Sequence, residues 1–378
     1  MKYVCSENKC TGCMACMSTC PKKAISIKDD LFALNAVIDE SLCIDCGLCH
    51  KVCQVCTPVE LKKPISWKQG WSEEDRKESS SGGFAAAISH SFIESGGVVC
   101  SCIFSDGNFV FDVAKSHEKV CKFTGSKYVK SNPIQAYRII KEELLNGKRC
   151  LFIGLPCQVA GLKKTLSEKL KSNLYTVDLI CHGSPSVKLL DYYLTQHGYP
   201  LSGVDSIIFR RKESFGISSK HQMLSKYGTA DCYTIAFLNS LTYTENCYSC
   251  GYAKLERVSD LTLGDSWGSE LPQDEQKKGI SIAISQTVKG EELLRLANLT
   301  TYDVDLKKAV SVNHQLVHPS VAPKAYKSFF NAVQANKNFD LQVWKIFPRL
   351  CFRQWIKKVL IRFKIIGGGL LNNYRNEK

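Results

Sequence analysis

The chain has 378 residues, a formal net charge of +14 and twenty cysteines. This length accommodates two or three domains of ~150 residues each. The first residues show no apolar signal segment, and no stretch approaches the ~18 apolar residues of a membrane span. Without export, so many thiols indicate metal or redox work in a reducing compartment rather than a secreted disulfide framework. We therefore expect a cytoplasmic protein.

Most of the positive charge lies at the C-terminal end. Residues 341–378 hold nine basic side chains and one acidic one, which leaves a net charge of +6 for the other 340 residues. Because the basicity is mostly a property of this tail, the overall charge is weak evidence for a nucleic-acid partner.

Eight cysteines near the N-terminus fall into two runs of the same spacing, C-x2-C-x2-C-x3-C. The runs consist of Cys10, Cys13, Cys16 and Cys20, then Cys43, Cys46, Cys49 and Cys53. This spacing is typical of bacterial two-cluster ferredoxins, in which the fourth cysteine of each run binds the other cluster. It predicts one 4Fe-4S cluster on Cys10, Cys13, Cys16 and Cys53, and a second on Cys43, Cys46, Cys49 and Cys20. A zinc ribbon or a disulfide framework is the alternative, although zinc usually takes CxxC pairs.

The surrounding pattern divides the first 80 residues in two. Alternating apolar residues at 24–28 and 32–38 predict the strands of a small sheet between the two cysteine runs. Residues 1–58 are thus expected to form the ferredoxin-type domain. Residues 59–80, with six charged side chains between 73 and 78, are expected to form a linker.

Beyond the linker, short apolar runs alternate with helical stretches. Buried strands are predicted at 97–104, 149–153 and 175–180. Helices are predicted at 84–93, 158–170 and 187–197. This alternation favours an α/β domain over residues 81–300 with a largely buried sheet. With the ferredoxin-type module it gives an α+β chain, followed by an extension at 301–340.

The tail at 341–378 carries apolar residues at steps of three and four. They are Phe352, Trp355, Ile356, Val359, Phe363 and Ile366, and Gly367, Gly368 and Gly369 are expected to end the helix. Basic residues flank this stripe on both sides. Such a helix suits the surface of an anionic membrane. The alternative is an amphipathic helix packed on its own domain.

Four further cysteines occur at the ends of predicted strands or in a CxxC pair, which are positions that suit metal ligands or a reactive thiol. Cys157 follows a predicted strand at the start of a helix, Cys181 follows the next strand, and Cys247 and Cys250 form a CxxC pair. Together they supply four thiolates, which is enough for a third 4Fe-4S cluster. Alternatively, they are buried cysteines that fill space, or the helix N-terminus lowers the pKa of Cys157 and makes it a nucleophile.

Seven motifs in a fixed order carry a family resemblance. They lie at 79–83 (SSSGG), 125–129 (GSKYV), 154–162 (GLPCQVAGL), 178–186 (DLICHGSPS), 209–212 (FRRK), 247–250 (CYSC) and 257–268 (RVSDLTLGDSWG). With these motifs, the chain resembles the beta subunits of coenzyme F420-reducing hydrogenase and the related F420H2 dehydrogenases over roughly residues 5–300. The resemblance favours the third cluster.

The resemblance also implies FAD beside an iron–sulfur cluster, with hydride exchange to a deazaflavin. Carried over by position, the flavin contacts are Ser80, Ser81, Gly82, Gly83, Gly125, Ser126, Lys127 and Tyr128. Serines and glycines at a helix start offer backbone N–H groups to a pyrophosphate, and Lys127 would favour an anionic reduced flavin. On its own, SSSGG is compatible with a linker that ends in a helix cap.

Several polar residues near these motifs have two interpretations each. His182 is either a proton donor or hydrogen-bond donor beside a cluster, or a locally satisfied side chain. Arg257, Asp260 and Asp265 orient a cofactor or substrate, or else form ion pairs and a helix cap. Arg210, Arg211 and Lys212 either bind an anionic substrate or form a solvated face.

We therefore predict an iron–sulfur flavoprotein oxidoreductase that passes electrons between ferredoxin-type clusters and FAD. Its partner would be a redox protein or a soluble hydride carrier, and the tail would allow peripheral contact with a membrane. A non-catalytic electron-transfer subunit is the alternative. Another is an accessory redox protein of cell-surface polysaccharide biosynthesis, because chains of this type are also similar to proteins encoded among such enzymes. Two departures from the family pattern, Gln54 for proline and Ile217 for tryptophan, leave the substrate open.

Overall fold

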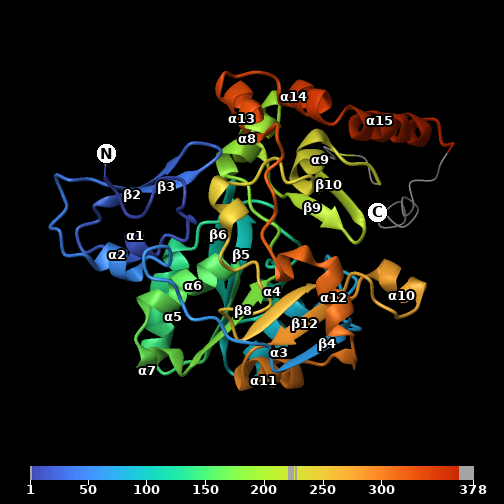
Figure 1. Ribbon diagram of the computed structural model, residues 1–378. Helices are drawn as coiled ribbons and strands as arrows, with labels where there is room; N and C mark the ends of the chain where they lie inside the picture. The colour runs from blue at the N-terminus through green and yellow to red at the C-terminus, as the bar shows by residue number, and fades with distance from the viewer. Residues whose placement is uncertain (1, 220–224, 226–227, 366–378) are drawn as a thin grey trace.

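The computed structural model describes residues 2–219, 225 and 228–365 (Figure 1). Its N-terminal module is a three-stranded antiparallel sheet in the order β1-β3-β2, with two short helices. These elements are β1 Lys2–Tyr3, α1 Ala15–Thr19, β2 Ile25–Asp29, β3 Leu34–Ile38 and α2 Leu48–Val52. Each cysteine run begins in the loop that leads into one of these helices, α1 for the first run and α2 for the second.

An eight-stranded sheet in the order β13-β4-β12-β11-β8-β7-β5-β6 forms the centre of the molecule. Its strands are β4 Ser66–Trp71, β5 Val98–Ser105, β6 Asn108–Ala114, β7 Cys150–Gly154, β8 Leu174–Leu179, β11 Leu261–Asp265, β12 Ser281–Ser285 and β13 Thr300–Tyr302. The four central strands β5, β7, β8 and β11 are parallel, and antiparallel strands extend both edges. The carboxyl ends of the central strands therefore meet at one edge of the sheet, where α/β proteins usually bind ligands.

Helices cover both faces of this sheet (Figure 1). One face packs against α3 Phe84–Glu94 and α11 Val288–Leu296, and the other against α5 Ile134–Leu145 and α6 Pro156–Thr165. Alternate residues of β7 serve the two faces, because side chains on a strand point in opposite directions. Leu151 and Ile153 pack on the α3 side, whereas Cys150 and Phe152 pack on the α5 side.

A second helical layer lies beyond the carboxyl ends of the strands. Its members share one hydrophobic core. They are α8 Val187–Gln196, the hairpin β9 Ile208–Arg211 and β10 Ser214–Ser218, α9 Cys232–Leu238, α13 Tyr326–Gln334, α14 Phe339–Ile346 and α15 Pro348–Arg362. The smaller helices α4 His117–Cys121, α7 Glu168–Lys171, α10 Gln273–Lys278 and α12 Leu306–Val312 complete the periphery, with 3-10 turns at Leu201–Gly203, Glu245–Ser249 and His314–Leu316.

The mixed α/β architecture with a ferredoxin-like N-terminal module agrees with the sequence analysis, and the predicted strands match β2, β3, β5, β7 and β8. The helix predicted at 158–170 is divided, because α6 ends at Thr165 and Leu166 is extended before α7 begins. The predicted tail helix corresponds to α15, which ends at Arg362. Its proposed stop at residues 367–369 lies outside the described residues.

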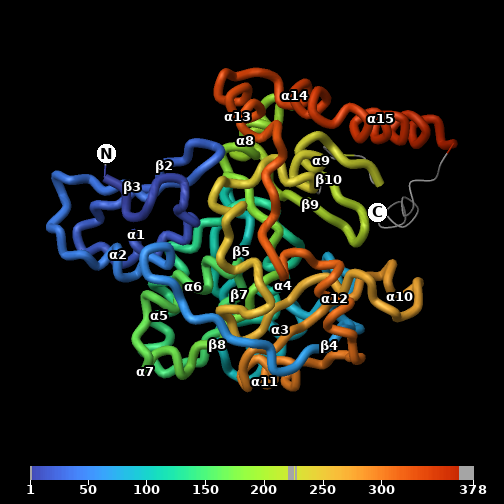
Figure 2. Tube along the Cα trace, in the orientation of Figure 1, coloured from blue at the N-terminus to red at the C-terminus, as the bar shows by residue number. Residues whose placement is uncertain are grey.

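The expectation of a linker at 59–80 is wrong for part of that range. Residues 66–71 form β4, which pairs with β12 and β13 inside the main sheet. Figure 2 shows the segment after α2 crossing the molecule to reach this position. Likewise, β13 extends the sheet beyond residue 300. The charged stretch at 73–78 is typical of a linker, but it directly follows β4. The partners of this strand are distant in sequence, so no local pattern indicates the pairing.

The N-terminal module shares its hydrophobic core with the main domain. Helix α1 packs against α5 and α6, and Tyr137 of α5 donates a hydrogen bond of 2.8 Å to the Cys13 carbonyl. Gly161 of α6 allows this approach, because a Cβ at that position would lie 3.2 Å from the Cys13 sulfur. The module is therefore fixed in position against the domain.

Among the described residues, no helix is both long enough and apolar enough to span a bilayer.

A buried ion pair fixes the loop that carries the CxxC pair. The side chains of Arg257 and Asp178 are 1% and 0% exposed, and Nη2 of Arg257 lies 2.9 Å from Oδ1 of Asp178. Arg257 also donates hydrogen bonds to the carbonyls of Tyr252 and Leu179. The arginine thus pairs with Asp178 at the end of β8, and not with Asp260, which accepts hydrogen bonds from Thr176.

We expect Arg257→Ala to lower the free energy of unfolding by about 3–5 kcal/mol, because it leaves the Asp178 carboxylate buried without a counter-charge. Arg138→Ala removes the exposed pair with Glu142 and is the matched control, with an expected loss of at most about 1 kcal/mol. Anaerobic urea denaturation followed by circular dichroism measures both. Equal losses in the two variants would contradict a structural role for the buried pair.

Candidate functional site

The N-terminal cysteines line two separate cavities. The inner cavity is lined by Cys10, Cys13, Cys16 and Cys53, with the additional thiol of Cys5 at its wall. The first three cysteines come from the loop into α1 and from α1 itself, and Cys53 directly follows α2. The inner cavity therefore joins three cysteines of the first run to the fourth cysteine of the second.

The outer cavity, of about 140 Å³, is lined by Cys20, Cys43, Cys46 and Cys49. Here too, the fourth cysteine of one run meets three of the other. Backbone N–H groups face the sulfur atoms, with Ala24 N lying 3.3 Å from the Cys20 sulfur and Asp45 N 3.4 Å from that of Cys43. Hydrogen bonds to the sulfur ligands are one of the factors that set the potential of an iron–sulfur cluster. Cys46 is exposed, so the outer cavity lies at the surface.

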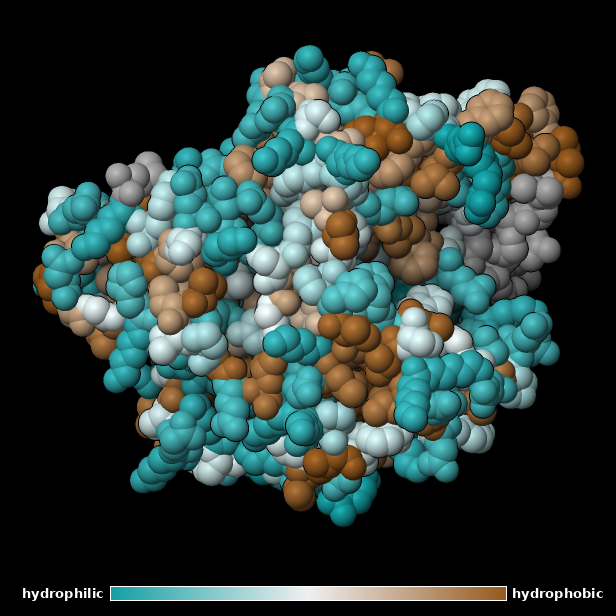
Figure 3. Space-filling model, viewed as in Figure 1, coloured by the Kyte–Doolittle hydropathy of each residue, from teal (hydrophilic) through white to brown (hydrophobic). Residues whose placement is uncertain are grey.

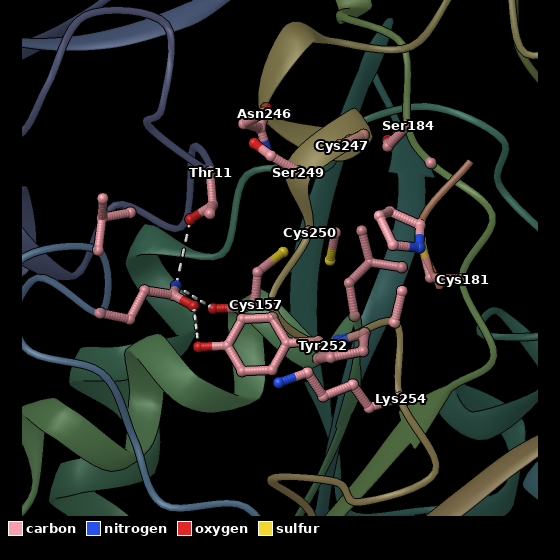
Figure 4. A pocket seen from close by; sticks show the side chains of 18 of the residues that line it. Thr11, Cys157, Cys181, Ser184, Asn246, Cys247, Ser249, Cys250, Tyr252 and Lys254 are labelled. Atoms are coloured by element: carbon pink, nitrogen blue, oxygen red, sulfur yellow. Dashed lines mark hydrogen bonds between the residues drawn. The ribbon is translucent and has the colours of Figure 1, made fainter. Parts of the chain in front are cut away.

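A third, central cavity of about 410 Å³ is lined by Cys157, Cys181, Cys247 and Cys250. Cys157 follows β7 at the start of α6, and Cys181 follows β8. Cys247 lies in the 3-10 turn Glu245–Ser249, and Cys250 directly follows it. Figure 4 shows these side chains around the cavity, with the Cys157 and Cys250 sulfur atoms directed into it. Four thiols from three distant chain segments thus meet at the carboxyl edge of the sheet.

A buried lysine lies beside these four thiols. Lys130 is 5% exposed and lines the central cavity. Burial alone would lower the pKa of Lys130, but the four cysteines, as thiolates, outweigh this effect and raise it. The cavity therefore combines thiol ligands with a fixed positive charge. This residue could not be predicted as part of a site, because nothing in its local sequence distinguishes Lys130 from a surface lysine.

Burial also decides the state of Cys157. One interpretation of the sequence is that the N-terminus of a helix lowers the pKa of this thiol. In the structure, Cys157 is the second residue of α6, but burial raises its pKa, and neighbouring cysteines add to that shift against the opposing effect of Lys130. An activated nucleophile at Cys157 is therefore not supported.

The inner and central cavities are neighbours. Thr11 and Val55 line both of them. Gln54, which is 5% exposed, donates hydrogen bonds to Thr11 Oγ1 at 3.1 Å and to the Cys157 carbonyl at 2.6 Å. It also accepts a hydrogen bond from the Tyr252 hydroxyl. The residue that departs from the family's proline thus connects the N-terminal module to the central cavity.

Three polar side chains named in the sequence analysis, His182, Arg210 and Asp265, lie near one another. Arg210 forms an ion pair of 2.6 Å with Asp265 and is largely buried, so it does not belong to a solvated face. Asp265 accordingly pairs with an arginine instead of capping a helix. Burial lowers the pKa of His182 to about 4, which makes its imidazole neutral at pH 7, and the ring lies close enough to Asp265 and Arg210 to be affected by their charges. Its Nδ1 lies 2.7 Å from the Gln315 amide nitrogen.

The residues expected to contact a flavin lie near this ion pair, where Gly82 and Gly83 are buried and the other six are at least partly exposed. The Ser126 amide donates a hydrogen bond of 3.1 Å to Ser80 Oγ, which joins the two flavin motifs. Gly125 is exposed and Ser80 and Ser81 are half-buried, so this surface is accessible. Lys212 donates to the Ser81 carbonyl at 3.1 Å, and burial lowers its pKa to about 8.

The two glycines and Lys127 have structural roles in the same region. Gly83 precedes α3 with φ of +88°, and a Cβ on Gly82 would clash with the Gly70 carbonyl oxygen. Lys127 donates to the carbonyls of Phe123 and Thr124, and burial lowers its pKa to about 8. Packing against β4 and β12 therefore accounts for Gly82, and the left-handed backbone beside the Asp75–Arg76 loop accounts for Gly83, without a cofactor.

An aromatic cluster connects this surface to the central cavity. The Tyr128 ring stacks on Phe237 with centroids 4.7 Å apart, and Phe237 packs edge-on against Tyr243 at 5.3 Å. Tyr243 and Phe237 share a core cluster with Cys247. A Cβ on Gly183, two residues after Cys181, would clash with the Tyr243 ring. The candidate flavin surface and the central cavity thus share one packed wall.

Comparisons with known proteins support two assignments. Residues 147–307 match the family described as the C terminus of the coenzyme F420 hydrogenase/dehydrogenase beta subunit, and residues 9–56 match the 4Fe-4S dicluster domain. The chain is 25% identical over 194 residues to one subunit of the F(420)H(2) dehydrogenase of Methanosarcina mazei, a match that covers 47% of this chain and 54% of that protein.

Two further matches cover different parts of the chain. Ferredoxin-2 of Chlorobaculum tepidum is 40% identical over 55 residues, which cover 14% of this chain and 82% of that ferredoxin. A chain of the F420-reducing NiFe hydrogenase complex from Methanosarcina barkeri, solved with xenon, aligns with a TM-score of 0.48 and 19% identity, covering 73% of this chain and 96% of that chain. The match to the F(420)H(2) dehydrogenase subunit covers about half of the length of that protein.

The fold and the N-terminal match define an iron–sulfur protein of the electron-transfer class, with a ferredoxin-type dicluster domain joined to an α/β domain. More particularly, residues 147–307 are similar to the C terminus of the coenzyme F420 hydrogenase/dehydrogenase beta subunit. This confirms the resemblance found in the sequence motifs.

The crossed arrangement of the N-terminal cysteines makes a prediction that paired substitutions can test. Cys20→Ser with Cys46→Ser should remove one cluster and about four irons, because both side chains line the outer cavity. Cys16→Ser with Cys20→Ser should remove two clusters and about eight irons, since they line different cavities. Iron and sulfide analysis of anaerobically purified protein gives both numbers. The opposite result would assign each run to its own cluster.

Proposed function

We propose that this protein is an iron–sulfur flavoprotein oxidoreductase that carries electrons between its ferredoxin-type module and a hydride-exchanging FAD. Cys157, Cys181, Cys247 and Cys250 would hold a third 4Fe-4S cluster in the central cavity. When bound, cubanes supply one-electron transfer, and the flavin supplies the exchange of two electrons as a hydride. The observation that carries the proposal is the meeting of these four thiols beside the buried charge of Lys130.

The donor set of the central cavity fits an iron–sulfur cluster. It offers four sulfur ligands, as expected for a 4Fe-4S cubane. Thiolate-ligated clusters carry net negative charge, and burying such charge is costly unless a counter-charge is nearby. Lys130 provides that counter-charge from within the cavity wall. Among the described residues, no group of His, Cys, Asp or Glu closes on a single metal ion.

The positions of the three cavities support a route for electrons, from the outer cavity through the inner cavity to the central cavity or in reverse. The outer cavity reaches the surface at Cys46, which suits exchange with a soluble redox protein. The inner cavity borders the central one, with Thr11, Val55 and Gln54 at the boundary. From the central cavity, the aromatic wall of Tyr128, Phe237 and Tyr243 leads to the candidate flavin surface.

The residues proposed to bind FAD are Ser80, Ser81, Gly82, Gly83, Gly125, Ser126, Lys127 and Tyr128. Backbone N–H groups at the start of α3 would face the pyrophosphate. Lys212 adds positive charge beside Ser81, whereas Arg210, beside Tyr128, is already paired with Asp265. The charge of Lys212 would favour a phosphate or a reduced, anionic flavin. The similarity to one subunit of an F(420)H(2) dehydrogenase makes a deazaflavin our first candidate for the hydride partner.

The third cluster can be tested by iron analysis. We expect about twelve irons per chain in anaerobically purified protein and about eight in Cys247→Ser and in Cys250→Ser, because each substitution removes one ligand of the same cubane. Cys232→Ser is the matched control, since that thiol lies on α9 outside the central cavity, and it should retain about twelve. About eight irons in the unmodified chain would eliminate the third cluster.

Flavin content separates the proposed oxidoreductase from a non-catalytic electron-transfer subunit. We expect one FAD per chain, bleached on anaerobic addition of a reduced deazaflavin or a nicotinamide hydride donor. The bleached flavin should then pass electrons to the clusters, which become visible by EPR. Protein that retains its clusters but holds no flavin after reconstitution with FAD would support the non-catalytic role instead. The accessory role in polysaccharide biosynthesis would predict FAD without a deazaflavin reaction.

A further inference from the structure

The last helix of the structure presents an apolar face that the described residues do not cover. Helix α15 packs against α9 and α14. On the packed side Cys351 is 2% exposed, and Gln354 accepts a hydrogen bond of 3.0 Å from the Ala230 amide. The rest of the helix extends along the edge of the molecule (Figure 1).

The uncovered face is rich in large apolar side chains. Phe352, Trp355 and Phe363 are 53%, 52% and 69% exposed, and Ile356 is also exposed. Their spacing of three, four and seven residues places them on one stripe of the helix. The Phe352 and Trp355 rings stack with centroids 5.8 Å apart. Figure 3 shows hydrophobic residues gathered at this corner of the molecule. We call these four residues the apolar stripe.

Positive charge borders the apolar stripe. Helix α15 contains no acidic residue, and its basic residues are Arg349, Arg353, Lys357, Lys358 and Arg362. On a helical projection, the first three flank the stripe on one side and the last two on the other. The 15 residues of α15 rise about 22 Å, and charges along that whole length are incompatible with a position across a bilayer.

We propose that α15 docks this protein on an anionic lipid surface. The apolar stripe would enter the boundary between headgroups and acyl chains, where tryptophan and phenylalanine are favoured, and the flanking cations would face lipid phosphates. A second copy of the chain is a poorer occupant, because the stripe of each copy is bordered by charge of the same sign. A nucleic acid would leave the apolar stripe in water.

This proposal is independent of the redox assignment. A docked α15 would hold the electron-transfer module and the α/β domain next to the membrane without a spanning helix. It also accounts for the concentration of charge noted in residues 341–378. Of that segment, the proposal uses only the described helix α15 and Phe363, which directly follows it.

Vesicle flotation of the full chain tests the proposal. We expect binding to vesicles of phosphatidylcholine mixed with phosphatidylglycerol, and little binding to phosphatidylcholine alone. Phe352→Ser with Trp355→Ser, and Arg353→Glu with Lys357→Glu, should each lower the partition coefficient at least about tenfold. Matched controls are Leu145→Ser with Val321→Ser, which are 65% and 77% exposed elsewhere, and Lys324→Glu with Lys327→Glu. Each control should change binding less than about twofold.

A fluorescence measurement locates the contact and guards against misfolding. Brominated lipids should quench part of the tryptophan emission of the unmodified protein, and Trp355→Phe should bind vesicles but lose that quenching. Unchanged circular dichroism and cluster absorbance would show that the variants are folded. Equal binding to neutral and anionic vesicles, or binding unchanged in either double variant of α15, would overturn the proposal. So would a dimer that Trp355→Ser dissociates while no vesicle binding occurs.

Discussion

The parallel pairing of β7 with β8 is the constraint on which the central cavity depends. Because neighbouring parallel strands end at the same edge of a sheet, the residues that follow them are brought together however far apart they are in the chain. Cys157 and Cys181 follow these two strands. The Arg257–Asp178 pair then holds the loop of Cys247 and Cys250 against the end of β8. The β7–β8 pairing thus places Cys157 and Cys181 together, and the buried ion pair holds Cys247 and Cys250 beside them.

The position of the N-terminal module is fixed by contacts with the same part of the domain, near Cys157. The module is not joined to the domain by a free linker, because β4 pairs within the main sheet and α1 packs against the core formed by α5 and α6. Gln54 and Tyr137 add hydrogen bonds to the loop and helix that carry Cys157. The inner cavity is consequently positioned by the helix that also presents a thiol to the central cavity. The contacts that fix the N-terminal module against the domain therefore also position Cys157.

Much of this could be predicted from the sequence where the signal is local. Cysteine spacing indicated the ferredoxin-type module, and apolar runs located the buried strands. Residues that act through distant contacts could not be found in this way. Lys130 looks like any lysine until the ends of β7 and β8 and the loop of the CxxC pair bring four thiols around it, and β4 has partners more than two hundred residues away. The partner of Arg257 could not be chosen from the sequence, because Asp178 is 79 residues away along the chain and is brought beside it by the fold.

The shared core between the N-terminal module and the α/β domain has a consequence for kinetics. Many multidomain redox proteins deliver charge by swinging a tethered carrier between docking positions, and their rates then depend on the length of the tether and the viscosity of the solvent. Here α1 is embedded between α5 and α6, with Gly161 in close contact with Cys13. Packing, and not a tether, therefore sets the separation between the inner and central cavities, and the electron transfer proposed between them would proceed at a rate insensitive to solvent viscosity.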